Sequence, residues 1–223
     1  MIEKAQQYFE QNNYVSVKNF ISQDLANFLY TYAITKVKQT DFKKTHATDF
    51  YDKEWDGSFG DIQIPNSFYY YGDPVMESLL IGIADKVSQY TGKNLVPTYT
   101  YWRLYQHGDI LKRHRDRESC EYSATLCLGS NVSNVNPNEY PDYSWPIFVE
   151  SNQIDGLDGV PIKQNPGDIL IYKGTDVDHW RDEFKGLNHA QVFLHFNDSI
   201  GPYNLQYDGR PIIGIPKHFQ TSI

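Results

Sequence analysis

Apolar residues recur at helical spacing in two stretches of the N-terminal part of the chain. Ser22 stands where an N-cap is wanted, directly before the first stretch. The second begins at Pro74, with Asp73 as its expected cap, and closes at Thr91-Gly92. The apolar positions are Leu25, Phe28, Leu29, Tyr32 and Ala33 in the first stretch and Met76, Leu79, Leu80, Ile83, Ala84 and Val87 in the second. The pattern therefore predicts two amphipathic helices.

From about residue 97 the pattern changes to that of strands. Alternating or short apolar runs follow turn residues at 98–106, 122–128, 146–150, 168–173 and 190–196. A short alternating run at 14–18 precedes the first helix, and 40–67 is expected to be an irregular connection. Helices followed by several short strands favour a β-sandwich or barrel braced by helices. We predict one domain, with helical support and the irregular connection over 1–96, a β core over 97–198 and a tail over 199–223.

The composition is that of a globular domain. The chain has 223 residues, 40% of them apolar and 22% charged, which excludes disorder, collagen and coiled coil. No apolar stretch approaches the roughly 18–20 residues that cross a bilayer, and the chain does not start like a signal peptide. Two cysteines, Cys120 and Cys127, are too few for a disulfide framework, so we expect a reducing, cytoplasmic compartment. A formal net charge of −8 without a long basic run argues against a nucleic-acid partner.

The motif His114-Arg-Asp116 is the most informative one for chemistry. Alternate side chains of an extended segment point to the same face, so this histidine and aspartate can share one metal. His179 would complete a set of two histidines and one carboxylate. Such a set leaves coordination positions open and suits Fe(II) that binds a chelating co-substrate and O₂, although zinc also accepts these ligands. The structural alternative is a turn histidine beside an aspartate that bonds nearby backbone.

The surroundings of the motif favour the metal interpretation. A strand and turn containing Tyr105 and Gly108 precede it, and Asn165-Pro-Gly-Asp168 leads into an apolar strand shortly before the distal histidine. With these motifs, residues 98–198 resemble the iron(II)- and 2-oxoglutarate-dependent oxygenases, in their prolyl-4-hydroxylase-like branch. Asn19-Phe-Ile-Ser22 is also similar to that branch.

This resemblance implies a mainly β fold with flanking helices, built on a double-stranded β-helix (jelly-roll) core. It also implies that His114, Asp116 and His179 are both the iron ligands and the catalytic centre. The cofactors it implies are Fe(II), 2-oxoglutarate as co-substrate and O₂, with ascorbate in a supporting role.

The chain departs from the family at the residue that anchors the co-substrate. An Arg or Lys of the last core strand usually pairs with the far carboxylate of 2-oxoglutarate, but Asn188 and His189 stand at those positions here. Protonated His189 is one candidate, since a facing carboxylate raises a histidine pKa. Arg181 and Arg103 are others, because a guanidinium is always charged and binds a carboxylate through two hydrogen bonds. Tyr105 is a candidate hydroxyl donor. The sequence leaves this choice open, with Arg181 and His189 ahead of Arg103.

The leading functional hypothesis is a dioxygenase that hydroxylates an unactivated C–H bond of a peptidyl, amino-acid or small-molecule substrate and releases succinate and CO₂. Residues 129–144 form a long loop that is the first candidate for substrate contact. The alternative is a cupin-like jelly roll that binds a metal and a small ligand, or acts as an isomerase, without 2-oxoglutarate. A third class is a catalytically silent fold that binds proteins. No membrane partner is expected, and a nucleic-acid demethylase ranks low because the chain is acidic.

Overall fold

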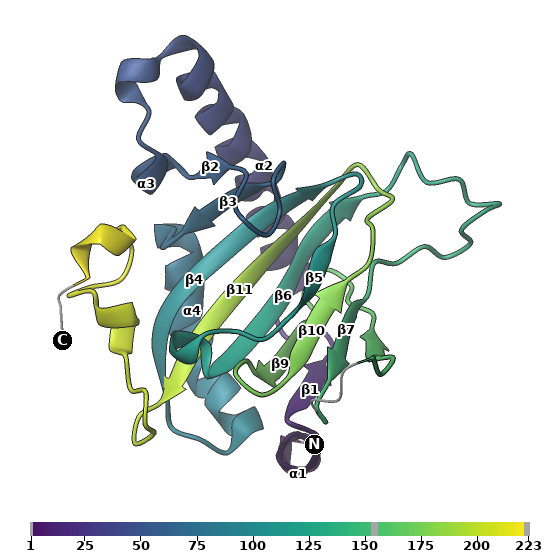
Figure 1. Cartoon of the computed structure of the whole chain (residues 1–223), viewed down its shortest axis with the longest axis vertical. Coiled ribbons are helices and arrows are strands. Elements are labelled where there is room, and N and C mark those ends of the chain that lie inside the picture. Colours follow the sequence, from purple (N-terminus) through teal and green to yellow (C-terminus); the bar gives the residue numbers. More distant parts are fainter. Residues whose placement is uncertain (1, 153–155, 221–223) are drawn as a thin grey trace.

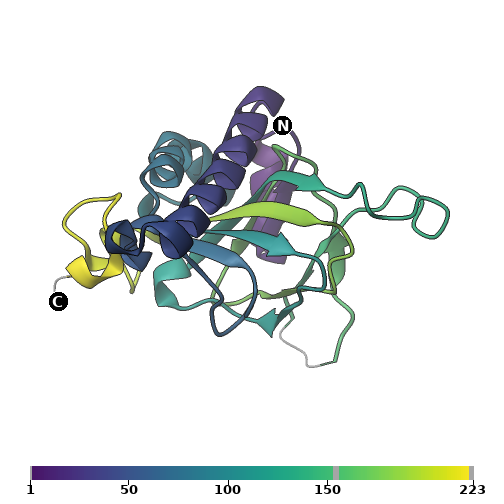
Figure 2. The same cartoon turned by 90° about the horizontal axis from the view of Figure 1, so that it is seen from above.

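Two antiparallel sheets form the body of the protein, and helices cover one side of it (Figures 1 and 2). The computed structural model describes residues 2–152 and 156–220. Within these residues, the larger sheet has seven strands in the order β1-β9-β6-β11-β4-β3-β2, and the smaller has four in the order β5-β10-β7-β8. The mainly β, jelly-roll fold expected from the sequence is confirmed.

The elements follow one another with short connections, except between β6 and β7. The helices are α1 (Ile2–Asn12), α2 (Gln23–His46), α3 (Lys53–Asp56) and α4 (Pro74–Thr91), with 3-10 turns at Thr48–Phe50, Glu118–Cys120, Gln206–Gly209 and Lys217–Phe219. The strands are β1 (Tyr14–Val17), β2 (Ser58–Phe59), β3 (Phe68–Tyr71), β4 (Leu95–Gln106), β5 (Leu111–His114), β6 (Tyr122–Asn131), β7 (Ile147–Glu150), β8 (Val160–Ile162), β9 (Ile169–Lys173), β10 (Asp178–Arg181) and β11 (Asn188–Asp198).

Both long helices begin at the caps predicted from the sequence. Ser22 Oγ accepts the N–H of Leu25 at the start of α2, and Asp73 Oδ1 accepts the N–H of Val75 at the start of α4. Gly92 ends α4 in the left-handed conformation at φ 67°, which costs glycine little. Local side-chain chemistry therefore determines where these helices start and stop.

The N-terminal part differs from the prediction in several respects, and strand β3 was not predicted. The segment 40–67, expected to be irregular, contains the end of α2, all of α3 and strand β2. In α2, Phe28 and Leu25 are 62% and 38% exposed instead of buried. The buried face of α2 consists of Ala26, Leu29, Ala33 and Thr40. These residues keep helical spacing, so the buried face of α2 is shifted from the predicted one and Leu25 and Phe28 are left exposed.

The central strands β4 and β11 separate an apolar layer from a polar one. Toward the helices, β11 presents Ala190, Val192, Leu194 and Phe196, which join the main hydrophobic core. Toward the smaller sheet it presents His189, Gln191, Phe193 and His195, a largely polar face. The main core therefore lies between sheet and helices, which leaves the space between the two sheets available for polar side chains.

The C-terminal tail packs beside α4 and the start of β4. Arg210 forms a fully buried ion pair with Glu77 of α4, at 2.6 Å between Nη2 and Oε1. Asp208 accepts two hydrogen bonds from the guanidinium of Arg117. No helix among the described residues is long and apolar enough to cross a membrane.

Candidate metal centre

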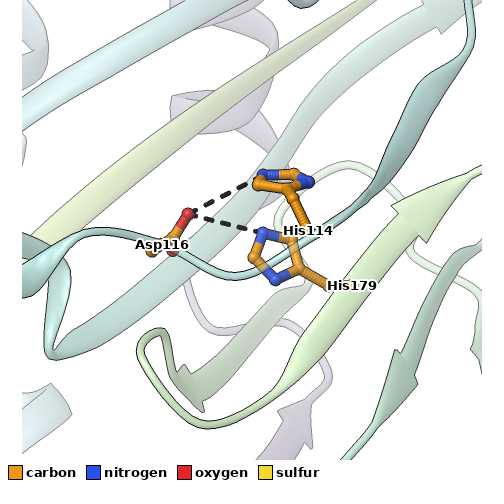
Figure 3. A group of neighbouring side chains, drawn as sticks. All are labelled: His114, Asp116 and His179. Carbon is orange, nitrogen blue, oxygen red and sulfur yellow. Dashed lines mark ion pairs between the residues drawn. The ribbon is translucent and has the colours of Figure 1, made fainter. Parts of the chain in front are cut away.

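His114, Asp116 and His179 come together between the sheets (Figure 3). His114 is the last residue of β5, and His179 is its direct partner on the neighbouring strand β10. Their ring centroids are 4.2 Å apart, and Asp116 follows β5 by two residues. Strand pairing thus brings the distal histidine to the His-x-Asp motif.

The two imidazoles are oriented by the same kind of hydrogen bond, from Nδ1 to the backbone carbonyl two residues earlier. Nδ1 of His114 lies 2.8 Å from the carbonyl oxygen of Lys112, and Nδ1 of His179 lies 3.1 Å from that of Val177. A carbonyl oxygen only accepts hydrogen bonds, so each Nδ1 carries the proton and each Nε2 carries a lone pair, which at His179 lies 3.4 Å from the Tyr172 hydroxyl. The Nε2 atoms lie 3.8 and 3.5 Å from Oδ1 of Asp116.

The carboxylate of Asp116 is fixed from its other side. Its Oδ2 accepts hydrogen bonds from the hydroxyls of Ser123 at 2.7 Å and Tyr172 at 3.3 Å. Its backbone N–H donates to the carbonyl of Gly174, where a Cβ would overlap the carbonyl oxygen of Cys120 and lie 2.8 Å from Oδ2. Glycine is therefore required at position 174 because of this close approach.

The electrostatics favour the metal-binding form of Asp116 and His114, whereas the charge of Asp116 outweighs burial and raises the pKa of His179. Burial opposes the charge of Asp116, but the imidazoles of His179, His195 and His114 hold the pKa of its carboxyl well below the usual range. Burial and the neighbouring His179 lower the pKa of His114. The donor set is two neutral imidazole nitrogens and one carboxylate oxygen, all within 4.8 Å of one another, which fits Fe(II).

A cavity of about 390 Å³ opens over the three residues. This volume is in the range of small-molecule sites. Its walls include Tyr99, Tyr101, Arg103 and Tyr105 from β4, Leu111 from β5, and Phe193 and His195 from β11. Asp61 and Gln63, from the connection between β2 and β3, also reach the cavity and were not expected from the sequence.

Three buried hydrogen-bond donors near this cavity have no acceptor among the described residues. Arg103 Nη1, Tyr105 Oη and Arg181 Nε are buried and lack a hydrogen-bond partner among the described residues. The positive charges of both arginines act on the Tyr105 hydroxyl. Since a buried donor without a partner is costly, the arrangement fits an anionic ligand such as the far carboxylate of 2-oxoglutarate.

The two arginines differ in their surroundings. Arg103 lines the cavity, and its Nη2 is held by the Asp61 carboxylate at 2.5 Å and by Gln63 at 2.8 Å. Arg181 stacks on the Trp145 ring and donates to the carbonyl of Trp145 at 2.6 Å and to Gln164 at 3.2 Å. Arg103 therefore faces a ligand in the cavity more directly than Arg181 does.

His189 is buried and hydrogen-bonded at both ring nitrogens. Its Nδ1 lies 2.6 Å from Ser130 Oγ, and its Nε2 lies 2.8 Å from Gln191 Oε1. Burial and the charge of Arg181 lower its pKa to about 3, so the ring is neutral. A neutral ring with both nitrogens engaged does not meet the requirement for a carboxylate anchor.

The long loop between β6 and β7 projects away from the sheets (Figure 1). None of the described residues of 129–144 lines the cavity. The loop expected to contact substrate is therefore not part of the cavity wall. The connection between β2 and β3 lies at the cavity instead.

Comparisons with known proteins point to one group of solved structures. No family model and no curated protein matches the sequence. A prolyl-4-hydroxylase from Pseudomonas putida is similar over 89% of this chain and 99% of its own, with a TM-score of 0.57 and 15% identity. The carbocyclase SnoK from nogalamycin biosynthesis, a non-heme α-ketoglutarate-dependent enzyme, is similar over 96% of this chain and 92% of its own, with a TM-score of 0.61 and 11% identity.

The epimerase SnoN, in complex with Fe³⁺, α-ketoglutarate (2-oxoglutarate) and nogalamycin RO, is similar over 89% of this chain and 84% of its own, with a TM-score of 0.60 and 11% identity. The chain has the fold of the iron- and 2-oxoglutarate-dependent oxygenases. At such identities the likeness establishes the fold alone. These oxygenases include a hydroxylase, a carbocyclase and an epimerase, so the fold does not determine which reaction the protein catalyses.

Proposed function

We propose that the protein is an Fe(II)- and 2-oxoglutarate-dependent dioxygenase that hydroxylates an unactivated C–H bond. The supporting observation is the juxtaposition of His114, Asp116 and His179, with both Nε2 atoms facing one carboxylate oxygen, beneath a cavity of suitable size. Together with 2-oxoglutarate and O₂, iron would supply the oxidising power, with release of succinate and CO₂. The protein's own residues orient the ligands, anchor the co-substrate and restrict water.

We assign the far carboxylate of 2-oxoglutarate to Arg103 and Tyr105. Both lie on the same face of β4, both line the cavity, and each has one buried donor without a partner. The contacts of Asp61 and Gln63 to Nη2 of Arg103 leave its Nη1 for a ligand. Arg181 supplies a second, buried positive charge, and its Nε is the third buried donor without a partner among the described residues.

Two features of the cavity bear on how a substrate would bind. Tyr101 and Tyr99 provide aromatic walls, which suit the apolar part of a substrate. Arg115 and Arg117 also lie at this cavity, and each is paired with a carboxylate, that of Asp178 and that of Asp208 respectively.

An anaerobic titration with Fe(II), with and without 2-oxoglutarate, tests the proposal. We expect a visible metal-to-ligand charge-transfer band when both are present, and its loss in His179→Ala. Iron binding without the band would instead support the cupin-like alternative. A substrate panel that includes peptides and small carboxylic acids, with succinate formation as the readout, would then test hydroxylation.

The same titration distinguishes the candidate anchors. A hydrogen bond to a charged group contributes about 1.5–3 kcal/mol, so Arg103→Met should weaken 2-oxoglutarate binding roughly 10- to 100-fold. Tyr105→Phe should have a smaller effect in the same direction. Arg181→Met is the matched comparison, and a larger loss there than in Arg103→Met would move the anchor to Arg181.

A further inference from the structure

Tyr99 and Cys120 form a buried phenol–thiol pair at the edge of the candidate metal centre. Tyr99 Oη and Cys120 Sγ are 3.0 Å apart, and the two residues are 7% and 2% exposed. The thiol also belongs, with Asp116 and His195, to a group of possible metal ligand atoms that lie within 4.8 Å of one another. A carboxylate that would bind iron is thus next to the sulfur, and the proposed hydroxylation gives Cys120 no role and uses Tyr99 only as part of the cavity wall.

The ring of Tyr99 is held in place by its neighbours. Its centroid lies 4.6 Å from that of His195 and 4.8 Å from that of Tyr71, and the guanidinium carbon of Arg117 lies 4.7 Å from it. Such contacts favour one ring orientation, so the hydroxyl end of the ring stays against the sulfur. Within the described residues, Cys127 has no comparable phenol contact, although it is equally buried.

We propose that Cys120 and Tyr99 become joined by a thioether bond between Sγ and Cε, the ring carbon ortho to the phenol hydroxyl. The S–H bond of Cys120 and one Cε–H bond of Tyr99 break, and an S–C bond forms. The two electrons and two protons released pass to one molecule of O₂, which leaves as hydrogen peroxide. The product would fix the wall of the cavity covalently and remove a thiol that is open to oxidation beside the metal.

This inference goes beyond the proposed function but rests on its metal for delivery of the oxidant. Because the thiol is buried, oxidants in the solvent reach it poorly. An oxidant formed from O₂ at iron bound by Asp116 would instead be produced inside the cavity, next to the thiol. The bond should therefore require both iron and air. Its formation should not require hydroxylation of a substrate with consumption of 2-oxoglutarate.

Mass spectrometry of the intact full chain tests the proposal. After incubation with Fe(II) in air, we expect a species lighter by two hydrogen atoms, about 2 Da, and none in the anaerobic sample. Titration of thiols in the denatured protein should find one of the two cysteines, and dithiothreitol should not restore the other, because a thioether is not reducible. Fragmentation should place the link between Tyr99 and Cys120.

Variants separate this bond from other oxidation products. Cys120→Ser and Tyr99→Phe should each abolish the mass loss, whereas Cys127→Ser should retain it. A mass loss that dithiothreitol reverses, or that Cys127→Ser removes, would identify a disulfide between the two cysteines and overturn the proposal. An unchanged mass after exposure to iron and air would overturn it as well. Iron binding measured on the same samples shows whether the proposed metal centre is also wrong, or whether only the thioether bond is absent.

Discussion

His114 and His179 are direct cross-strand partners in the pair formed by β5 and β10, with ring centroids 4.2 Å apart. Each ring is turned by a hydrogen bond from Nδ1 to the carbonyl two residues earlier. The two Nε2 atoms consequently point at the same oxygen of Asp116. The candidate metal site thus follows from strand register plus one local hydrogen bond at each histidine.

Removal of one of these imidazoles should abolish tight iron binding. Changing an outer partner of a metal ligand typically costs 10–100-fold in affinity, so loss of the ligand itself in His179→Ala should cost more than about 100-fold. Anaerobic calorimetry with Fe(II) or Co(II) measures this. His107→Ala, in an exposed turn, is the control and should bind as the wild type does. Wild-type affinity in His179→Ala would exclude this residue as a ligand.

Gly174→Ala should damage the metal centre without changing any ligand. A methyl group there would overlap the carbonyl of Cys120 and press on Oδ2 of Asp116, so the loop must shift. We expect metal affinity to fall by about 10-fold or more, with a loss of stability of about 1–3 kcal/mol. Gly82→Ala, in α4 with open space around it, is the matched control and should not reduce stability. Equal behaviour of the two variants would contradict the packing argument.

Asp168 should stabilise the fold in a pH-dependent manner. Burial opposes its charge, but hydrogen bonds from the backbone N–H of Asn165, from Lys18 and from the N–H of Asn19 outweigh burial and hold its pKa below the ordinary 3.8. A lowered pKa means that the carboxylate contributes stability above pH 3.8 and loses it as the pH falls further.

Asp168→Asn should therefore cost about 1–3 kcal/mol at neutral pH, and the difference from wild type should shrink below pH 3.8. Urea unfolding across this pH range measures it, with Asp49→Asn at an exposed position as the control. A difference that stays constant with pH would contradict an electrostatic origin.

The buried ion pair between Glu77 and Arg210 should hold the C-terminal tail against α4 and β4. Arg210 also donates to the carbonyls of Thr98 and Ile215, and both members of the pair are fully buried. Arg210→Met leaves a buried carboxylate without its partner, which should cost about 3–5 kcal/mol. Combined with Glu77→Gln the loss should be smaller than the sum of the two single losses, as denaturant unfolding would show. Additive losses would indicate that the two groups act independently.

Much of the fold was accessible from the sequence because its signals are local. Ser22 and Asp73 cap helices through bonds to N–H groups only two or three residues away, so they mark the starts of α2 and α4 in any context. Five strands of the core (β4, β6, β7, β9 and β11) were predicted from alternating or short apolar runs, with ends that differ by a few residues, whereas the short strands β5, β8 and β10 were not predicted. The predicted stripe of α2 failed at Leu25 and Phe28, because packing against the sheet selects a neighbouring face of the helix, whose buried residues Ala26, Leu29, Ala33 and Thr40 keep the helical spacing.

The site was accessible only in part. The motif His114-Arg-Asp116 and the resemblance it supports pointed to the three metal-binding candidates, which the structure brings together. The anchor for the co-substrate could not be chosen, because Arg103, Arg181 and His189 all lie on strands whose inward face depends on register. Asp61 carried no sequence signal at all, since its contact with Arg103 joins a connection to a strand about forty residues away.

The sequence by itself determined the hydrophobic periods, the helix caps, the excess of negative charge and the residues able to bind a metal. The tertiary structure decided which of these side chains come into contact. Pairing of β5 with β10 joins two histidines 65 residues apart, and pairing of β4 with β11 turns Arg103 and Tyr105 toward the cavity. The physical reason is that hydrogen bonds between strands set register over long separations, and a shift by one residue would turn every one of these side chains to the opposite face.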